Sequence, residues 1–407
     1  MKCRHCHAPL TLSFVDLGSA PPSNAYLTEA ALKKPETWYP LRVLVCSDCR
    51  LVQTEDYAGA SEIFTDSYAY FSSYSRSWLE HAEKYVSAMT ERFGLNEKSL
   101  VVELAANDGY LLQYVKARGI PCIGVEPTAS TAKAARDKGI EIIENFFGVQ
   151  LADEMVSLGQ QANLMAANNV LAHVPDINDF VSGVGLLLKE DGVATFEFPH
   201  LLNLVANNQF DTIYHEHYSY LSLSAVSRIF ERNGLSVFDV EEIPTHGGSL
   251  RVFAQRISST RPRSAAVGKL LDREKSVGVL TDAYYAGFQS RTDRVKNDFL
   301  RFLVDAKREG KKVAGYGAAA KGNTLMNYAG VRPDLMPYVV DKSPAKQGKF
   351  LPGTRIPVVS EARIRNEHPD FVVVLPWNLW DEVTSDLSYM RDWGGRCVRA
   401  VPELQVG

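Results

Sequence analysis

Apolar residues recur along this chain in two alternating patterns. Residues 76–93 carry them at the three-to-four spacing that predicts an amphipathic helix. From residue 99 onward, short apolar runs typical of buried strands alternate with segments of helical spacing, such as those near 149–158 and 176–188. Repeated alternation of strands and helices predicts a parallel sheet with helices on both faces. We therefore expect an α/β protein.

A second series of the same kind begins near residue 311 and includes apolar segments at 336–343 and 370–377. Between the two series, residues 223–256 predict a helix followed by two strands, and residues 261–310 predict solvated helices of mixed charge that act as a connector. The chain has 407 residues, which is enough for two to four domains of about 150 residues each. The pattern thus predicts two α/β units joined by helices.

Composition and charge exclude several functional classes. Hydrophobic residues make up 45% and charged residues 23%, as in ordinary globular proteins. The 44 basic and 48 acidic residues leave a net charge of -4, which disfavours a protein that holds nucleic acid through its phosphates. No apolar run approaches the ~18–20 residues needed to span a membrane, and the N-terminus lacks the apolar core of a signal peptide. We expect a cytoplasmic protein with no nucleic-acid or membrane partner.

Four of the six cysteines form two CxxC pairs, Cys3 with Cys6 and Cys46 with Cys49. Two residues between thiolates let a tight turn direct both sulfurs at one ion, and two such turns make a tetrahedral Zn²⁺ site. A disulfide framework is disfavoured because the chain carries no export signal. Four protein ligands leave no open position on the ion, so we predict a structural zinc site.

Residues 101–109 (VVELAANDG) place a turn of small residues between a strand and a helix, the arrangement of a nucleotide site at a sheet edge. The turn lacks GxGxxG, and the next strand ends at Glu126, which could accept hydrogen bonds from ribose hydroxyls. Asn168 and Asn169 end a later strand, and His173 follows. These features fit either NAD or S-adenosylmethionine (SAM). The candidate cofactor-binding residues of the turn are Glu103, Ala105, Asn107 and Gly109.

The segment Tyr214-His215-Glu216-His217 is the richest in reactive side chains. In an extended segment, positions 215 and 217 point one way and 216 the other, so convergence on a metal ion is awkward. A solvated loop is a further alternative. We favour acid–base catalysis, because histidine titrates near neutral pH and tyrosine donates hydrogen bonds to a developing oxyanion. Such a set suits proton abstraction next to a carbonyl.

A glycine-bearing turn at 315–322 follows a basic strand in the second series. Glycines allow close backbone approach, the next helix N-terminus favours an anion, and Lys321 adds a full charge. The segment is not a P-loop, because the GK[ST] ending is absent. It is either a structural turn or a contact for the phosphate groups of a ligand.

Taken together, these motifs resemble the SAM-dependent C-methyltransferases that act on nucleotide-linked 4-keto-deoxysugars. The resemblance covers essentially the whole chain, and the order of its motifs is specific. The motifs are the two CxxC pairs, SYAYFSSYS at 67–75, VELAANDG at 102–109, YHEHYSY at 214–220, THGGSLR at 245–251 and GYGAAAKGNTL at 315–325.

The resemblance implies a class I SAM methyltransferase domain of Rossmann-like α/β fold between two other domains. The implied boundaries are a zinc-binding domain at 1–66, the SAM domain at 67–256, a helical connector at 257–300 and a C-terminal Rossmann-like domain at 301–407. The cofactors would be SAM and a structural Zn²⁺. The substrate would lie in the cleft between the parts.

The resemblance also implies roles. His217 would remove a proton next to the C4 ketone, with Glu216 as its orienting partner, and the resulting enolate carbon would attack the SAM methyl group. Tyr214, His173 and Tyr68 would steady the enolate or relay protons. Residues that would contact the substrate are Tyr70, His200, His246, Gly247, Gly317 and Lys321. The resemblance favours methylation at C3 over C5 and a dTDP carrier over GDP or CDP.

Two other enzyme classes compete with this interpretation. An NAD-dependent epimerase or dehydrogenase of nucleotide sugars is disfavoured by the missing GxGxxG in the first turn and by the absence of a Ser/Tyr-xxx-Lys pair beside the first predicted sheet. An O- or N-methyltransferase would need no base next to a ketone, whereas the HEH segment offers one. The sequence does not indicate an oligomeric state.

Overall fold

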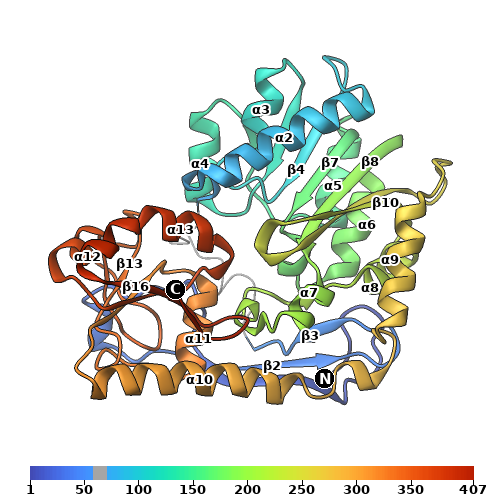
Figure 1. The fold of residues 1–407 in the computed structure, drawn as a ribbon. Helices are drawn as coiled ribbons and strands as arrows, with labels where there is room; N and C mark the ends of the chain where they lie inside the picture. The colour runs from blue at the N-terminus through green and yellow to red at the C-terminus, as the bar shows by residue number, and fades with distance from the viewer. Residues whose placement is uncertain (58–70) are drawn as a thin grey trace.

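The computed structural model describes residues 1–57 and 71–407 and contains three β-sheets (Figure 1). Tyr68 and Tyr70, predicted above to act in the site, lie outside the described residues. Successive parts of the chain form successive sheets, except that β9, from the middle of the chain, belongs to the first sheet. No helix of the described residues is both long and apolar enough to cross a membrane.

The N-terminal sheet is antiparallel and has the order β1-β2-β3-β9. Its strands are β1 (Leu12–Ala20), β2 (Tyr39–Val45), β3 (Val52–Thr54) and β9 (Ser219–Tyr220). Strand β9 lies directly after the HEH segment and pairs with β3 through Gln53 and Ser219. The N-terminal sheet is therefore completed by the middle of the chain.

The central sheet has the order β10-β11-β8-β7-β4-β5-β6. Five neighbouring strands pair in parallel, as the alternating pattern predicts, and β11 is antiparallel to both β8 and β10. Its strands are β4 (Val101–Leu104), β5 (Cys122–Val125), β6 (Glu141–Ile143), β7 (Ala162–Asn168), β8 (Leu188–Pro199), β10 (Leu235–Ile243) and β11 (Ser249–Arg256). The helices of this part are α2 (Arg76–Phe93), α3 (Leu112–Ala117), α4 (Ala129–Asp137), α5 (Val149–Ser157), α6 (Ile177–Leu187), α7 (Leu201–Ala206) and α8 (Leu223–Arg232).

The C-terminal sheet has the order β14-β13-β12-β15-β16-β17 and is parallel except for β17. Its strands are β12 (Val313–Tyr316), β13 (Val339–Val340), β14 (Val358–Val359), β15 (Phe371–Val374), β16 (Arg396–Arg399) and β17 (Gln405–Val406). Its helices are α11 (Ala320–Tyr328), α12 (Ala362–Glu367) and α13 (Trp380–Asp386). Its strand order changes direction at β12, so ligands are expected at the carboxyl ends of β12 and β15.

Two connector helices, α9 (Ala265–Ser276) and α10 (Phe288–Arg308), join the central and C-terminal parts. Helix α10 runs along one side of the molecule and packs against both β1 and β12 (Figure 1). Phe14 of β1 stacks on Phe288 of α10 at 4.3 Å between ring centroids, and Phe299 is fully buried. Burial of one such ring contributes about 1.5–3 kcal/mol. Residues of β1, α10 and β12 belong to one hydrophobic core, so the N- and C-terminal sheets share this core across α10.

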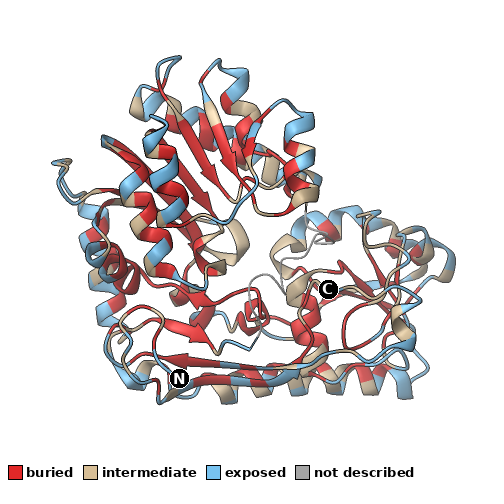
Figure 2. Cartoon of the chain, turned by 180° about the vertical axis from the view of Figure 1, so that it is seen from behind, coloured by how far each residue is buried: buried red, intermediate tan, exposed pale blue. Residues whose placement is uncertain are grey.

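Burial follows the pattern expected for layered α/β packing. The strands of the central sheet are red along most of their length in Figure 2, and the outer faces of the helices are exposed. All four residues of β4 are buried, including Glu103. A continuous run of buried residues is the mark of a strand covered on both faces.

Candidate zinc site and active site

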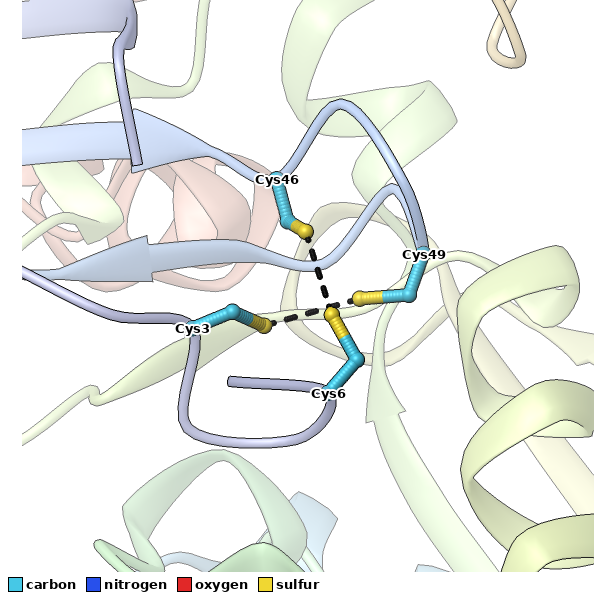
Figure 3. A group of neighbouring side chains, drawn as sticks. All are labelled: Cys3, Cys6, Cys46 and Cys49. Carbon is cyan, nitrogen blue, oxygen red and sulfur yellow. Dashed lines mark hydrogen bonds between the residues drawn. The ribbon is translucent and has the colours of Figure 1, made fainter. Parts of the chain in front are cut away.

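The four paired cysteines come together in the N-terminal part (Figure 3). Their sulfur atoms all lie within 4.8 Å of one another, with Cys3 Sγ 3.5 Å from Cys49 Sγ and Cys6 Sγ 3.4 Å from Cys46 Sγ. A Zn²⁺ ion bound at about 2.3 Å from each sulfur needs sulfur–sulfur separations of about 3.8 Å. The donor set and its spacing therefore fit a tetrahedral zinc ion. Among the described residues this is the one cluster of three or more His, Cys, Asp or Glu side chains that could hold a metal.

The zinc site is directly connected to the HEH segment. Gln53 donates a hydrogen bond from Nε2 to Cys3 Sγ at 3.3 Å, and its Oε1 accepts one from the amide of Arg4 at 2.9 Å. The next residue, Thr54, donates from Oγ1 to the carbonyl of His217 at 3.2 Å. Strand β3 therefore links the cysteine cluster to the segment that carries His217.

A cavity of about 530 Å³ lies where the three parts of the chain meet. This size is typical of small-molecule sites. The N-terminal part contributes Asn24, the C-terminal part contributes Ala319, Ala320, Lys321 and Lys346, and the central part contributes the rest. Predicted site residues that line the cavity are Ala105, Asn107, Glu126, Asn168, Asn169, His173, Tyr214, His217, His246 and Lys321.

The wall near the central sheet has the form of a nucleotide site. Ala105 and Asn107 adopt the left-handed backbone conformation, with φ of 54° and 49°, which turns the chain sharply at the end of β4. Glu126 at the end of β5 is 5% exposed, and its carboxylate accepts hydrogen bonds from the amides of Asn107 and Thr128 at 2.9 Å each. A buried carboxylate beside such a turn fits the ribose and amino-acid parts of SAM.

His217 and His173 form the reactive face of the cavity. His217 Nδ1 lies 2.8 Å from the carbonyl oxygen of Thr212, and His173 Nδ1 lies 2.7 Å from that of Glu216. A carbonyl can only accept, so each ring carries its proton on Nδ1 and its lone pair on Nε2. The ring of Tyr214 packs on His217 with centroids 4.0 Å apart, and that of His173 lies 4.6 Å away.

Burial sets the protonation state of these histidines. The pKa of His217 is held well below its usual value because the ring is desolvated, and His173 acts in the same direction. Burial also lowers the pKa of His173 to about 4. Both imidazoles are therefore neutral at pH 7.

The structure corrects the role predicted for Glu216. Its carboxylate does not orient His217 but accepts hydrogen bonds from the backbone and side-chain nitrogens of Asn24, each at 3.1 Å. The Thr212 carbonyl orients the His217 ring instead. His215 lies on another side, with Nε2 3.2 Å from the carbonyl of Pro40. The three side chains diverge and are all buried, which disfavours both a metal site and a solvated loop.

Five other predicted residues are not among those that line the cavity. His200 is fully buried, and its Nε2 lies 2.7 Å from Oε1 of Glu274, a buried residue of α9. The Glu274 carboxylate also accepts a hydrogen bond from the amide of Ser224 at the start of α8. Glu103 is buried within β4, which raises its pKa well above the usual range. Gly109 packs against Ile140.

The other two predicted residues that do not line the cavity are Gly247 and Gly317. Both have positive φ, and a Cβ would meet Trp377 at Gly247 and Pro376 at Gly317 within 2.5 Å. These glycines permit close approach of the THGG loop and the 315–322 turn to the segment after β15. The two glycines do not line the cavity themselves but let the loops that carry them pack closely against this segment.

Sequence reasoning missed several residues that do line the cavity. Lys346 comes from the segment after β13, and Trp78 comes from the first turn of α2. Phe146 and Phe147 follow β6 at the carboxyl edge of the central sheet, where the rule that ligands bind at strand ends could have found them. Asn24 carries no comparable signal, because it lies in an irregular segment far from the other residues in sequence.

Comparisons with known proteins agree with this architecture. Models described as "Putative zinc binding domain", "Methyltransferase domain" and "C-methyltransferase C-terminal domain" match residues 3–64, 78–240 and 244–402. The C-methyltransferase NovU of Streptomyces niveus is 35% identical over 405 residues, which span 100% of this chain and 96% of that protein. The chain belongs to this C-methyltransferase family.

As a SAM-dependent C-methyltransferase, the protein combines a four-cysteine zinc site, a methyltransferase domain and a C-terminal α/β domain. Membership of this family excludes the epimerase, dehydrogenase and O- or N-methyltransferase alternatives.

Two solved structures illustrate similarity to part of this C-methyltransferase. Magnesium protoporphyrin IX methyltransferase from Synechocystis PCC 6803 with bound SAM is 16% identical, with a TM-score of 0.34, and the match covers 44% of this chain and 79% of that one. The PH0226 protein from Pyrococcus horikoshii OT3 is 12% identical, with a TM-score of 0.37, and the match covers 46% of this chain and 95% of that one.

Proposed function

We propose that this enzyme methylates a ring carbon next to the C4 ketone of a nucleotide-linked deoxysugar, at C3 and on a dTDP carrier. The observation that carries the proposal is the neutral imidazole of His217, which lines the same cavity as the nucleotide-type wall at Glu126. A base is needed for carbon methylation next to a ketone, because the carbon becomes nucleophilic only when its proton leaves. The similarity to the C-methyltransferase NovU supports the same chemistry.

The cofactor side of the site is formed by the central sheet. Glu126 would accept hydrogen bonds from the ribose of SAM, and Ala105 and Asn107 would let the backbone pass its amino-acid end. Asn168 ends β7, and Asn169 follows it on the same wall. SAM, when bound, supplies an electrophilic methyl group.

On the other side of the cavity, His217 Nε2 takes the proton from the carbon next to the ketone. Tyr214, whose ring packs on His217, would donate a hydrogen bond to the substrate oxygen. His173 presents a lone pair on Nε2 and can accept a proton, so it suits a relay better than stabilisation of the enolate. The methylated carbon then retains the C4 ketone beside it.

A panel of 4-keto-deoxysugar nucleotides tests the proposal. Each is incubated with the protein and SAM, and mass spectrometry measures the gain of one methylene unit. Carbon–proton correlation spectra then locate the new methyl group. Methylation at C3 of a dTDP-linked 4-keto sugar is expected. Methylation of oxygen or nitrogen, or of a sugar without the ketone, would contradict the proposal.

Replacing Glu126 by glutamine should weaken the binding of S-adenosylhomocysteine. Loss of a hydrogen bond to a charged group costs about 1.5–3 kcal/mol, which corresponds to roughly 10–100-fold in the dissociation constant. Calorimetric titration measures this directly. Glutamine keeps one carbonyl acceptor for the turn amides, and the Glu274→Gln variant serves as a matched control at a buried carboxylate outside the cavity. Equal affinities in the Glu126 variant and the wild type would remove Glu126 from the cofactor site.

The pH dependence of kcat/KM should reflect the desolvation of His217. Because burial lowers the pKa of its imidazole, the base remains unprotonated below the usual histidine value of about 6.5. The acid limb of the kcat/KM profile should therefore lie below about pH 6.5. Initial rates measured in buffers of constant ionic strength give this limb. A limb near pH 7 or above would show that His217 is not the desolvated base described here.

A further inference from the structure

The cavity holds two cationic side chains. Of the described residues that line it, Lys321 and Lys346 are the only Lys or Arg. They occupy different positions: the Lys346 ammonium lies 2.8 Å from the carbonyl of Ala318 and 3.5 Å from Asp341, whereas Lys321 lies at the start of α11. A phosphate contact is one of the two roles that the sequence offers for the turn that carries Lys321, and the surroundings of this side chain indicate a different partner.

Lys321 is held against the segment that carries the base. Helix α11 packs on the short helix η4 (Phe210–Thr212), and Thr324 of α11 donates from Oγ1 to the carbonyl of Ile213 at 2.8 Å. Ile213 lies between Thr212, which orients His217, and Tyr214, which packs on it. One packed unit therefore fixes the base and the lysine relative to each other.

A hydrogen bond and an aromatic contact fix the position of the Lys321 side chain. Its Nζ donates to Asn378 Oδ1 at 2.7 Å and lies 4.8 Å from the centroid of the Trp377 ring. Trp377 Nε1 donates in turn to Asp211 Oδ2 at 2.7 Å. Two of the ammonium protons remain for other acceptors, and the buried Asp211 carboxylate provides a nearby counter-charge.

The charges around Lys321 support a role close to the base. Burial lowers the pKa of Lys321, and the carboxylate of Asp211 raises it. The positive charge of Lys321 also lowers the pKa values of His217 and His246, so it acts on the reactive face of the cavity. A cation in a desolvated site stabilises an oxyanion far more than one in water.

We propose that Lys321 is a catalytic residue that stabilises the enolate oxygen, not a phosphate contact. This inference rests on the proposed function. The carbon–hydrogen bond next to the ketone breaks, its proton moves to His217 Nε2, and its electron pair forms the carbon–carbon double bond. The π electrons of the ketone move onto its oxygen, and the Lys321 ammonium donates a hydrogen bond to that oxygen. No oxidant or reductant is needed.

The need for this cation follows from the state of the base. A histidine with a lowered pKa is a weak proton acceptor, so the product of the proton transfer must be strongly stabilised. Neutral His173 cannot donate from Nε2, because its proton is on Nδ1. The hydroxyl of Tyr214 is a neutral donor, and charge-assisted hydrogen bonds are about twice as strong.

Two measurements separate the enolate role from the phosphate role. The first is the rate at which the proton next to the ketone exchanges with D₂O, with dTDP-4-keto-deoxysugar saturating and S-adenosylhomocysteine in place of SAM. The second is the dissociation constant of dTDP alone, by calorimetry. In K321M we expect exchange to fall by about 10²–10³-fold and the dTDP dissociation constant to change by less than about threefold.

Control variants keep the test decisive. Lys342 lies after the same strand as Lys346 but pairs with Asp386 outside the cavity, so K342M should leave both measurements unchanged. K321R keeps the charge and should recover part of the exchange rate, even if K321M is less stable. A tenfold or greater loss of dTDP affinity in K321M, with exchange retained at saturation, would overturn the inference. Absence of both exchange and methylation in the wild type would instead overturn the proposed function.

Discussion

Replacement of His217 by asparagine should reduce methyl transfer by about 10²–10⁴-fold, the usual contribution of a general base. Asparagine can still donate from its amide to the Thr212 carbonyl that holds the native ring at 2.8 Å, so the segment should keep its shape. It offers no nitrogen lone pair to receive a proton. The binding of S-adenosylhomocysteine should therefore remain within about threefold of the wild type. Turnover measured at saturating sugar nucleotide and calorimetric titration together test this.

A matched variant distinguishes loss of the base from disturbance of the segment. His215 belongs to the same turn, but its Nε2 lies 3.2 Å from the Pro40 carbonyl, away from the reactive face. H215N should therefore lose less activity than H217N, and proton–deuterium exchange at the carbon next to the ketone should persist in it. If H217N retained full turnover, or if both variants were equally impaired, the assignment of His217 as the base would be wrong.

Substitution of Cys46 by serine should remove the metal and impair catalysis together. Zinc binding to four thiolates contributes about 10–16 kcal/mol in small domains, so loss of one ligand should lower the zinc content from about one ion per chain to a small fraction. Loss of the metal should also disturb the position of His217, because Gln53 and Thr54 connect the cysteine cluster to the segment that carries it. Elemental analysis and thermal unfolding measure the first effect, and we expect turnover to fall at least about tenfold.

Cys397 provides the matched control for this experiment. It is a free cysteine on β16 in the C-terminal sheet and is not part of the cluster. C397S should keep the zinc and nearly all of the activity. A C46S protein that retained both its metal and its turnover would show that the four cysteines do not hold zinc.

Features that depend on local spacing could be predicted from the sequence. The CxxC pairs place two sulfurs together by a tight turn, and the structure brings the pairs into one cluster. The alternation of strands and helices predicts β4, α3 and β5, and hence the position of Glu126 at a strand end. Helix α2 spans the predicted residues 76–93 because its apolar positions recur with helical spacing.

Features that depend on partners distant in sequence could not be predicted. The acceptor that orients His217 is a backbone carbonyl, which no residue type reveals. The segment around it is not extended, because the amide of His217 bonds to the carbonyl of Tyr214 at 2.9 Å and closes a turn. His200 follows a strand end like the site residues, but its partner is Glu274, on a helix of the connector. Each outcome depends on a contact that forms only in the folded chain.

The two-residue strand β9 has a consequence for synthesis on the ribosome. The N-terminal sheet pairs Gln53 with Ser219, so β3 has no neighbour on that edge until 165 further residues have been translated. At about 5–20 residues per second this takes roughly 10–30 s. An unpaired edge strand is a site of aggregation. The four clustered cysteines lie between residues 3 and 49, so the nascent chain can bind zinc early and keep the first strands ordered before β9 is made.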